Sequence, residues 1–132
     1  MKELNELNFP EDRRYTAEHV WIKADGDSWL VGISDYAQDQ LGEIAFVDLP
    51  AEGTEVEAGA EFGSVESLKS VNSLYMPVAG TVEAANEELE STPTLVNISA
   101  YEQGWMVRIR VADSAAVDGL MTAAEYIAGL AD

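Results

Sequence analysis

Residues 61–77 read EFGSVESLKSVNSLYMP, in which two runs of apolar and polar residues flank a short polar centre. Runs of this kind are typical of β-strands, and counting outward along both places Ser67–Ser70 at the tip of a hairpin. Lys69 lies at that tip, where its neighbours are unable to cover a long side chain. Four apolar positions are expected to pack together and hold the hairpin rigid: Phe62, Val65, Leu68 and Val71.

Short strands of the same kind are predicted on both sides of this hairpin. Residues 15–33 contain two apolar runs around an Asp-Gly-Asp turn, a pattern that predicts a β-hairpin. Glycines punctuate several further short runs between residues 43 and 76. Residues 105–111 alternate apolar side chains with Arg108 and Arg110, which predicts a strand with one face in water.

Two short helices are predicted between the strands. Ser34 precedes a short apolar-spaced run over 35–40 and Gly42 follows it, which is the pattern of an N-cap and a C-terminal glycine. Asn86 is placed to begin a single helical turn before Pro93.

A C-terminal helix is predicted over about 122–131. Thr122 and Glu125 have the spacing of a capping box, in which each side chain accepts a hydrogen bond from the other residue's backbone. Many short strands with a few small helices indicate one mainly β domain over 1–132, built as a barrel or sandwich. The apolar stripe of the helix is expected at Ala124, Ile127, Ala128 and Leu130 or Ala131.

The composition excludes several classes of function. The chain has no cysteine and a single histidine, so it is unable to build a disulfide, a thiolate metal site or a histidine cluster. Its net charge of −18 disfavours nucleic acid and anionic membranes and favours basic protein partners. Neither a targeting segment nor a membrane-spanning run is recognisable, which predicts a cytoplasmic protein or a matured organellar one. We expect it to be a monomer. Because the chain has no cysteine, any redox or thiol chemistry must come from an added cofactor.

Lys69 is the candidate attachment point for such a cofactor. The chain has only two other lysines, Lys2 and Lys23, so Lys69 is the sole ammonium group from residue 24 onward. A turn lysine often does no more than keep a loop soluble, and that interpretation stays open here. However, an exposed amine on a stiff hairpin, with Glu66 three residues before it as a charged handle, suits covalent modification by an enzyme.

From about Tyr15 to Ala131 the chain resembles the H proteins of the glycine cleavage system, a family of lipoyl carriers. The resemblance implies a barrel-sandwich hybrid in which a lipoyl-attaching enzyme joins lipoic acid to Lys69 through an amide. Glu66 and Gly80 match positions typical of lipoyl hairpins. The matching segments are GISDYAQDQLGEIAFVDLP (32–50), FGSVESLKSVNSLYMPVAGTV (62–82), NEELESTPTLVN (86–97), YEQGW (101–105) and AAEYIAGL (123–130).

The same resemblance implies a carrier without catalytic activity of its own. In this family the lipoyl group takes an aminomethyl group and electrons from glycine decarboxylase. An aminomethyltransferase then receives the methylene unit, and dihydrolipoyl dehydrogenase reoxidises the dithiol. Tethering suits this cycle, because a flexible arm gives the dithiol an effective concentration on the order of millimolar at each site.

The chain also departs from the family. H proteins commonly read His-Glu-Trp in the first strand, and the resemblance implies that this glutamate pairs with the amine of a loaded arm. Here the residues are His19, Val20 and Trp21, so Glu18 is the nearest acidic substitute. Val20, Ile98 and the strong acidity motivate an alternative, an H-like lipoate-binding protein serving sulfur oxidation by a heterodisulfide-reductase-like complex.

One further alternative, a biotin carrier, carries less weight. A biotin carrier usually has methionines beside its lysine, whereas Leu68 and Ser70 flank Lys69.

His19 is open to two interpretations, a structural hydrogen bond or a base facing the arm, and the structural one is favoured. The tryptophans are predicted to lie in the core rather than to line a groove, because they occupy alternating strand positions: Trp21, Trp29 and Trp105.

Overall fold

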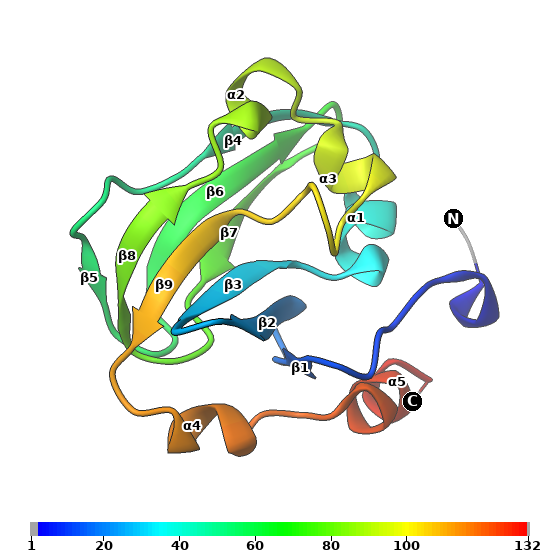
Figure 1. Ribbon diagram of the computed structural model, residues 1–132. Helices are drawn as coiled ribbons and strands as arrows, with labels where there is room; N and C mark the ends of the chain where they lie inside the picture. The colour runs from blue at the N-terminus through cyan, green and yellow to red at the C-terminus, as the bar shows by residue number, and fades with distance from the viewer. Residues whose placement is uncertain (1–2, 132) are drawn as a thin grey trace.

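Two antiparallel sheets make up most of the structure, a computed structural model that describes residues 3–131 (Figure 1). The larger sheet has the strand order β1 (Arg14–Tyr15), β2 (Val20–Asp25), β3 (Ser28–Ile33), β9 (Val107–Val111), β8 (Gly80–Ala85), β5 (Glu55–Val56). The smaller sheet has the order β4 (Ile44–Asp48), β6 (Glu61–Ser67), β7 (Val71–Tyr75). The predicted fold class, a mainly β barrel-sandwich hybrid with short helices, is confirmed.

The main core lies between these sheets and is almost entirely aliphatic. Its members come from nearly every strand, including Ile22, Val31, Val65 and Ile109, each of which is almost fully buried. Each strand turns alternate residues inward, so even two- to seven-residue strands contribute to one core. Short strands are therefore sufficient to fix the arrangement.

The predicted hairpin over 15–33 is confirmed as the β2–β3 pair. Its register runs from Val20 opposite Ile33 to Asp25 opposite Ser28, which leaves a two-residue loop. Gly26 takes the first position of this loop with a φ of +64°, a left-handed conformation that glycine adopts without strain. The turn therefore has a local cause in the sequence.

The first predicted helix is α1 (Asp35–Leu41), and its caps are those expected. The Ser34 side chain accepts a hydrogen bond from Ala37 N at 3.2 Å, and Gly42 follows the helix with a φ of +80°. The single turn near Asn86 is α2 (Glu88–Ser91), which begins two residues later than predicted. Three further elements lacked a recognised pattern: η1 (Leu4–Glu6), α3 (Leu95–Ile98) and α4 (Ala115–Asp118).

The C-terminal helix is α5 (Ala123–Ala131), and its capping box is present. Thr122 N donates to Glu125 Oε1 at 2.9 Å, and Glu125 N donates to Thr122 Oγ1 at 3.2 Å. The predicted apolar stripe was only partly correct: Leu130 is half-buried and packs against the body of the protein, but Ala124 and Ala128 are exposed. The fully buried residues of the helix are Ala123 and Tyr126, on the neighbouring face.

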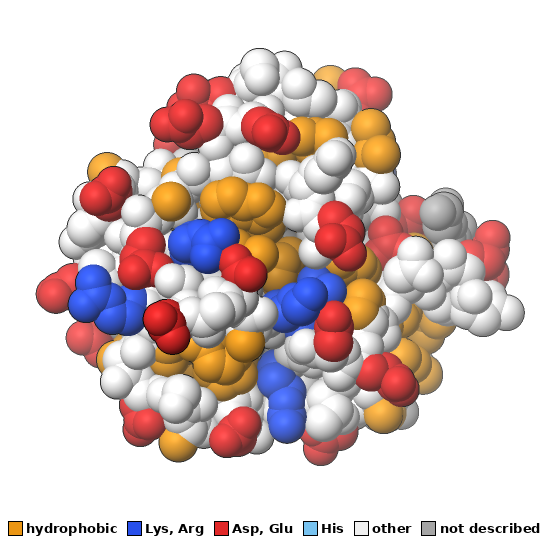
Figure 2. All heavy atoms as spheres, viewed as in Figure 1, with side chains coloured by type: hydrophobic (Ala, Val, Ile, Leu, Met, Phe, Trp, Pro, Cys, Tyr) orange, Lys and Arg blue, Asp and Glu red, His pale blue; other side chains and the backbone are white. Residues whose placement is uncertain are grey.

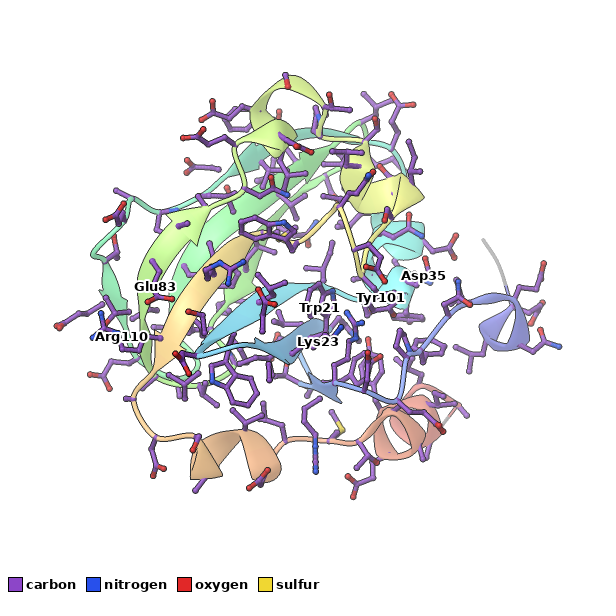
Figure 3. All side chains as sticks on the ribbon, in the orientation of Figure 1. Trp21, Lys23, Asp35, Glu83, Tyr101 and Arg110 are labelled. Carbon is purple, nitrogen blue, oxygen red and sulfur yellow. The ribbon has the colours of Figure 1, made fainter. Side chains whose placement is uncertain are left out.

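A second, aromatic cluster fastens α5 to the larger sheet. The rings of Tyr126 and Tyr15 are stacked, with centroids 4.8 Å apart. Trp21 is fully buried in the same cluster and lies beside Tyr101 (Figure 3). The Arg13 guanidinium lies over both of these rings, 4.7 Å from the Trp21 ring centroid and 5.0 Å from that of Tyr101.

The tryptophan prediction is confirmed for Trp21, whereas Trp29 and Trp105 are half-buried and pack against the edges of the two clusters.

The prediction that four apolar residues of the 61–77 hairpin pack together needs a correction. Phe62 and Val65 do lie in the core, but Leu68 is 74% exposed and Val71 64% exposed. Leu68 belongs to the turn, and Val71 lies opposite Glu66 on the outer face of the sheet.

The charged side chains are unevenly distributed over the surface. Figure 2 shows basic side chains over the larger sheet with carboxylates around them. Two arginines of strand β9 form ion pairs, Arg108 with Asp25 and Arg110 with Glu83. Over residues 3–131 no helix is both long and apolar enough to cross a bilayer.

Candidate functional site

Lys69 occupies the tip of the β6–β7 hairpin, in a turn held by hydrogen bonds. Ser67 N donates to Ser70 O at 2.8 Å, which closes the turn. The buried Ser67 hydroxyl accepts from Lys69 N and from Ser70 N, both at 3.1 Å. One serine side chain therefore fixes the backbone of the lysine and of the residue after it.

The Lys69 side chain is exposed, and its amine has no partner in the part of the chain that the structure describes. Within the described residues, it is the one lysine or arginine whose side chain makes neither an ion pair nor a hydrogen bond. Its stem runs past the end of α1, because a carbon added at Gly42 would lie 3.1 Å from Lys69 Cε. An amine with no partner to give up is well placed for chemical modification.

Ser67 was not singled out in the sequence, although a serine two residues before a turn lysine is a signal for this geometry. Replacing Ser67 with Ala is expected to leave two backbone N–H groups unpaired, at a cost of about 1 kcal/mol in unfolding free energy. Enzymatic modification of Lys69 should slow several-fold, because the turn loses its fixed shape. Time-resolved intact mass spectrometry measures that rate.

Ser70→Ala is the matched control for this experiment. Among residues 3–131, the Ser70 hydroxyl accepts a hydrogen bond only from Asn72 Nδ2, at 3.0 Å, and takes no part in closing the turn. Its variant should be modified at close to the wild-type rate. Equal rates for Ser67→Ala and the wild type would contradict the assigned role of Ser67.

The turn is hydrogen-bonded to the segment that follows α1, and the Asn97 side chain is hydrogen-bonded to the same segment. Leu68 N donates to Glu43 O at 3.2 Å, which connects the tip to the segment. The Asn97 side chain accepts from Ile44 N at 2.9 Å and donates to Gly42 O at 2.8 Å. Asn97 ends the Leu-Val-Asn motif, but only its contacts reveal its function.

Replacement of Asn97 with Ala is expected to reduce the unfolding free energy by about 2 to 3 kcal/mol, since it orphans several partly buried backbone groups at once. Urea denaturation followed by tryptophan fluorescence measures the loss. Asn72→Ala serves as a comparison, because the Asn72 amide has a single exposed partner, and it should cost less than about 0.5 kcal/mol. A loss no larger for Asn97→Ala would contradict the anchoring role.

A groove of about 400 Å³ runs between α1 and β7 on the side of the hairpin where Asn72 lies. Leu41 is one of its lining residues and is followed directly by Gly42, which the Lys69 stem passes. Glu18 and His19 also line this groove. The groove therefore begins one residue along the chain from the point where the Lys69 stem passes α1.

His19 is held by the C-terminal helix. Its Nδ1 lies 2.7 Å from the Tyr126 hydroxyl, which also lies 2.7 Å from the Ser34 hydroxyl that caps α1. The backbone of His19 has a φ of +68°, a left-handed conformation that is uncommon for residues other than glycine. The favoured structural interpretation of His19 agrees with these contacts, although its ring also lines the groove beside Tyr36.

Burial lowers the pKa of the His19 imidazole, and this outweighs the nearby Glu18 charge that would raise it. A histidine with a lowered folded pKa stabilises the fold above its unfolded pKa of about 6.5, and this contribution is lost as the pH falls below that value. Compared with a His19→Asn variant, the wild type should therefore lose unfolding free energy between about pH 7.5 and about pH 5.5. Urea denaturation across this range measures the difference, and a pH-independent difference would contradict the assignment.

Of the other two predicted site residues, Glu66 lies close to the lysine and Gly80 lies in the other sheet. Glu66 is exposed on β6, opposite Val71, close to the tip. Gly80 lies at the start of β8 in the other sheet, where a Cβ would come within 2.6 Å of the Arg110 carbonyl oxygen. The structure thus gives Gly80 a packing role and does not bring it to the tip.

The structure also shows where Val20, which replaces the glutamate of the family's His-Glu-Trp motif, and Glu18 lie. Val20 is 1% exposed and belongs to the main core, opposite Ile33. Glu18 is exposed and lines the groove, so it supplies a carboxylate there that Val20 does not.

Comparisons with known proteins match this geometry to one family. The family model described as "Glycine cleavage H-protein" matches residues 13–132. The chain belongs to the glycine cleavage H-protein family. Relatives in that family include the glycine cleavage system H protein of Geobacillus thermodenitrificans, which is 48% identical over 92% of this chain and 96% of its own length.

Two other similar proteins support the family assignment. The glycine cleavage system H protein of Halalkalibacterium halodurans is 50% identical over 90% of this chain and 93% of its own length. The crystal structure of a glycine cleavage system H protein from Mycobacterium marinum has a TM-score of 0.85 and 36% identity, over 93% of this chain and 99% of that one. The predicted family resemblance is confirmed, and the fold is that of the family over nearly the whole chain.

Proposed function

We propose that this protein is the lipoyl carrier of a glycine cleavage system and that Lys69 is its attachment residue. The observation that carries the proposal is the unpaired, exposed Lys69 amine on a turn fixed by Ser67. Membership of the H-protein family indicates that the pathway is glycine cleavage, because the relatives are named for it.

The residues around Lys69 suit a lipoyl group. An amide at Lys69 removes no ion pair from the described structure, and the groove between α1 and β7 offers about 400 Å³ to a flexible chain. A lipoyl group there supplies a dithiolane that accepts the aminomethyl group and electrons released from glycine. The polypeptide supplies presentation: the turn projects the arm, and the groove offers it a resting place.

Within the groove, Glu18 is the residue proposed to receive the amine of a loaded arm. Its carboxylate lines the same cavity as His19 and is exposed to solvent. Glu66, beside the tip, is proposed to contact the lipoyl-attaching enzyme. Gly80 matches the family pattern, and its proposed contribution is to let β8 approach β9 closely.

The proposed partners are glycine decarboxylase, aminomethyltransferase and dihydrolipoyl dehydrogenase, which act on the arm in turn. The carrier itself is proposed to be non-catalytic, monomeric and cytoplasmic. The sulfur-oxidation alternative is less well supported, because the relatives described above are all named for glycine cleavage.

Reconstitution tests this function. The lipoylated protein is combined with glycine decarboxylase, glycine and labelled bicarbonate, and exchange of label into glycine is measured against the unlipoylated protein. We expect exchange with the lipoylated form only. Absence of exchange by a protein whose lipoylation is verified by mass would overturn the assignment to glycine cleavage.

A further inference from the structure

A second cavity, which we call the α1–α3 hollow, adjoins the hairpin tip that carries Lys69. The helices α1 and α3 lie side by side (Figure 1), and the hollow between them has a volume of about 510 Å³. Gly42, Glu43 and Ile98 are among its lining residues. Within the described part of the chain, it shares no lining residue with the groove between α1 and β7, so the two cavities are separate.

The amine of Lys69 lies beside a residue that lines this hollow. A Cβ at Gly42 would lie 3.1 Å from Lys69 Cε and 3.6 Å from Lys69 Nζ. Glu43 also lines the hollow, and its carbonyl oxygen accepts a hydrogen bond from Leu68 N at the tip, at 3.2 Å. A chain joined to the amine through an amide therefore starts next to the α1–α3 hollow.

Ile98, at the end of α3, gives the hollow an apolar side chain. It is 75% exposed, the largest exposed fraction of any large apolar side chain in the described part of the protein. The preceding residue, Asn97, donates to Gly42 O and so holds α3 against the end of α1. Covering an exposed aliphatic side chain with another apolar group is favourable, because both lose contact with water. Ile98 is therefore positioned to contact an apolar chain that starts at Lys69.

The two amide side chains that line the hollow are already hydrogen-bonded within the protein. Gln38 Oε1 accepts from Asn97 Nδ2 at 2.9 Å, and Gln38 Nε2 donates to Asp35 Oδ1 at 2.7 Å. Asn97 is further bonded to the backbone of Gly42 and Ile44. These amides need no polar ligand to satisfy them, so the hollow suits an occupant that offers no hydrogen bonds, such as a hydrocarbon chain.

From these observations we infer that the α1–α3 hollow holds the hydrocarbon chain of a lipoyl group on Lys69 while its dithiolane is oxidised, with Ile98 as the chief apolar contact. This inference rests on the proposed attachment at Lys69. An oxidised lipoyl amide is uncharged, so the carboxylates that also line the hollow, Asp39 and Glu43, do not repel it. The groove in which Glu18 is proposed to receive the amine of a loaded arm then serves a different state of the arm.

NMR spectra of the unlipoylated protein and of the oxidised, lipoylated protein test where the arm lies, after peptide mapping verifies the group on Lys69. We expect amide shift changes at 42–43 and 94–98, and nuclear Overhauser contacts between the Ile98 methyl groups and the methylene protons of the chain. Changes confined to the tip, or largest at 72–75 in the α1–β7 groove, would overturn this inference alone. A protein that an active lipoyl-attaching enzyme leaves unmodified at Lys69 would overturn the proposed function and this inference with it.

Ile98→Ser, with Val71→Ser as its matched control, tests the apolar contact without any partner enzyme. Val71 is also aliphatic and exposed, and it is closer to Lys69 in the chain, but it does not line the hollow. The rate at which an uncharged phosphine, tris(hydroxypropyl)phosphine, reduces the dithiolane is measured for the wild type and both variants. We expect Ile98→Ser to be reduced about twofold faster or more, because its arm is less covered, and Val71→Ser to match the wild type. Equal rates for Ile98→Ser and the wild type, or equal acceleration in both variants, would overturn the inference.

Discussion

Replacement of Lys69 with Arg is expected to abolish lipoylation and reduce glycine exchange to the level of the unlipoylated protein. Arginine keeps the positive charge and the length of the side chain, but its guanidinium is not a substrate for amide formation in place of an amine. The folded structure should be unaffected, within about 0.5 kcal/mol, because the Lys69 side chain is exposed and unpaired. Intact mass, exchange activity and urea denaturation measure the three properties.

Lys23→Arg is the matched control for this substitution. Lys23 is also accessible, but it lies in β2 and its amine is 3.4 Å from Asp12 Oδ2. Its variant should accept a lipoyl group and support exchange as the wild type does. Retained carrier activity in Lys69→Arg would mean that another group serves as the anchor.

Truncation of Trp21 to Ala is expected to cost about 3 to 5 kcal/mol of unfolding free energy, the usual range for a fully buried tryptophan. Trp21 is 0% exposed, and its indole N–H donates to Ala100 O at 3.1 Å. The same ring covers Gly32, where any Cβ would come within 2.7 Å of it. The variant loses packing, a hydrogen bond and the support of Arg13 at once.

Trp29→Ala provides the comparison, measured in the same urea titrations. Trp29 is only half-buried and packs at the edge of the core, so its loss should cost clearly less than that of Trp21. Similar losses for the two variants would show that the aromatic cluster under α5 contributes less than the contacts indicate.

The sequence alone predicted the elements whose cause is local. The hairpin over 15–33 follows from alternation around Gly26, α1 follows from Ser34 and Gly42, and α5 follows from its capping box. The exposed tip at Lys69 was predicted for the same reason, because a polar centre between two strands leaves the turn in water.

The parts that sequence reasoning missed depend on contacts between distant residues. The face of α5 is determined by Tyr126 stacking on Tyr15, so helical periodicity alone found Leu130 but missed Tyr126. Val71 is apolar yet exposed, because its register opposite Glu66 turns it to the outer face. Asn97 likewise has an evident role only once α3 lies beside the end of α1.

Site mapping by mass spectrometry tests the central claim most directly. The wild-type protein is incubated with lipoate, ATP and a lipoyl-attaching enzyme, then digested, and each lysine-containing peptide is examined. We predict a single lipoyl group on Lys69, with Lys2 and Lys23 unmodified. A lipoyl group on either of those lysines, or an unmodified Lys69 peptide under conditions that lipoylate a known H protein, would contradict the account.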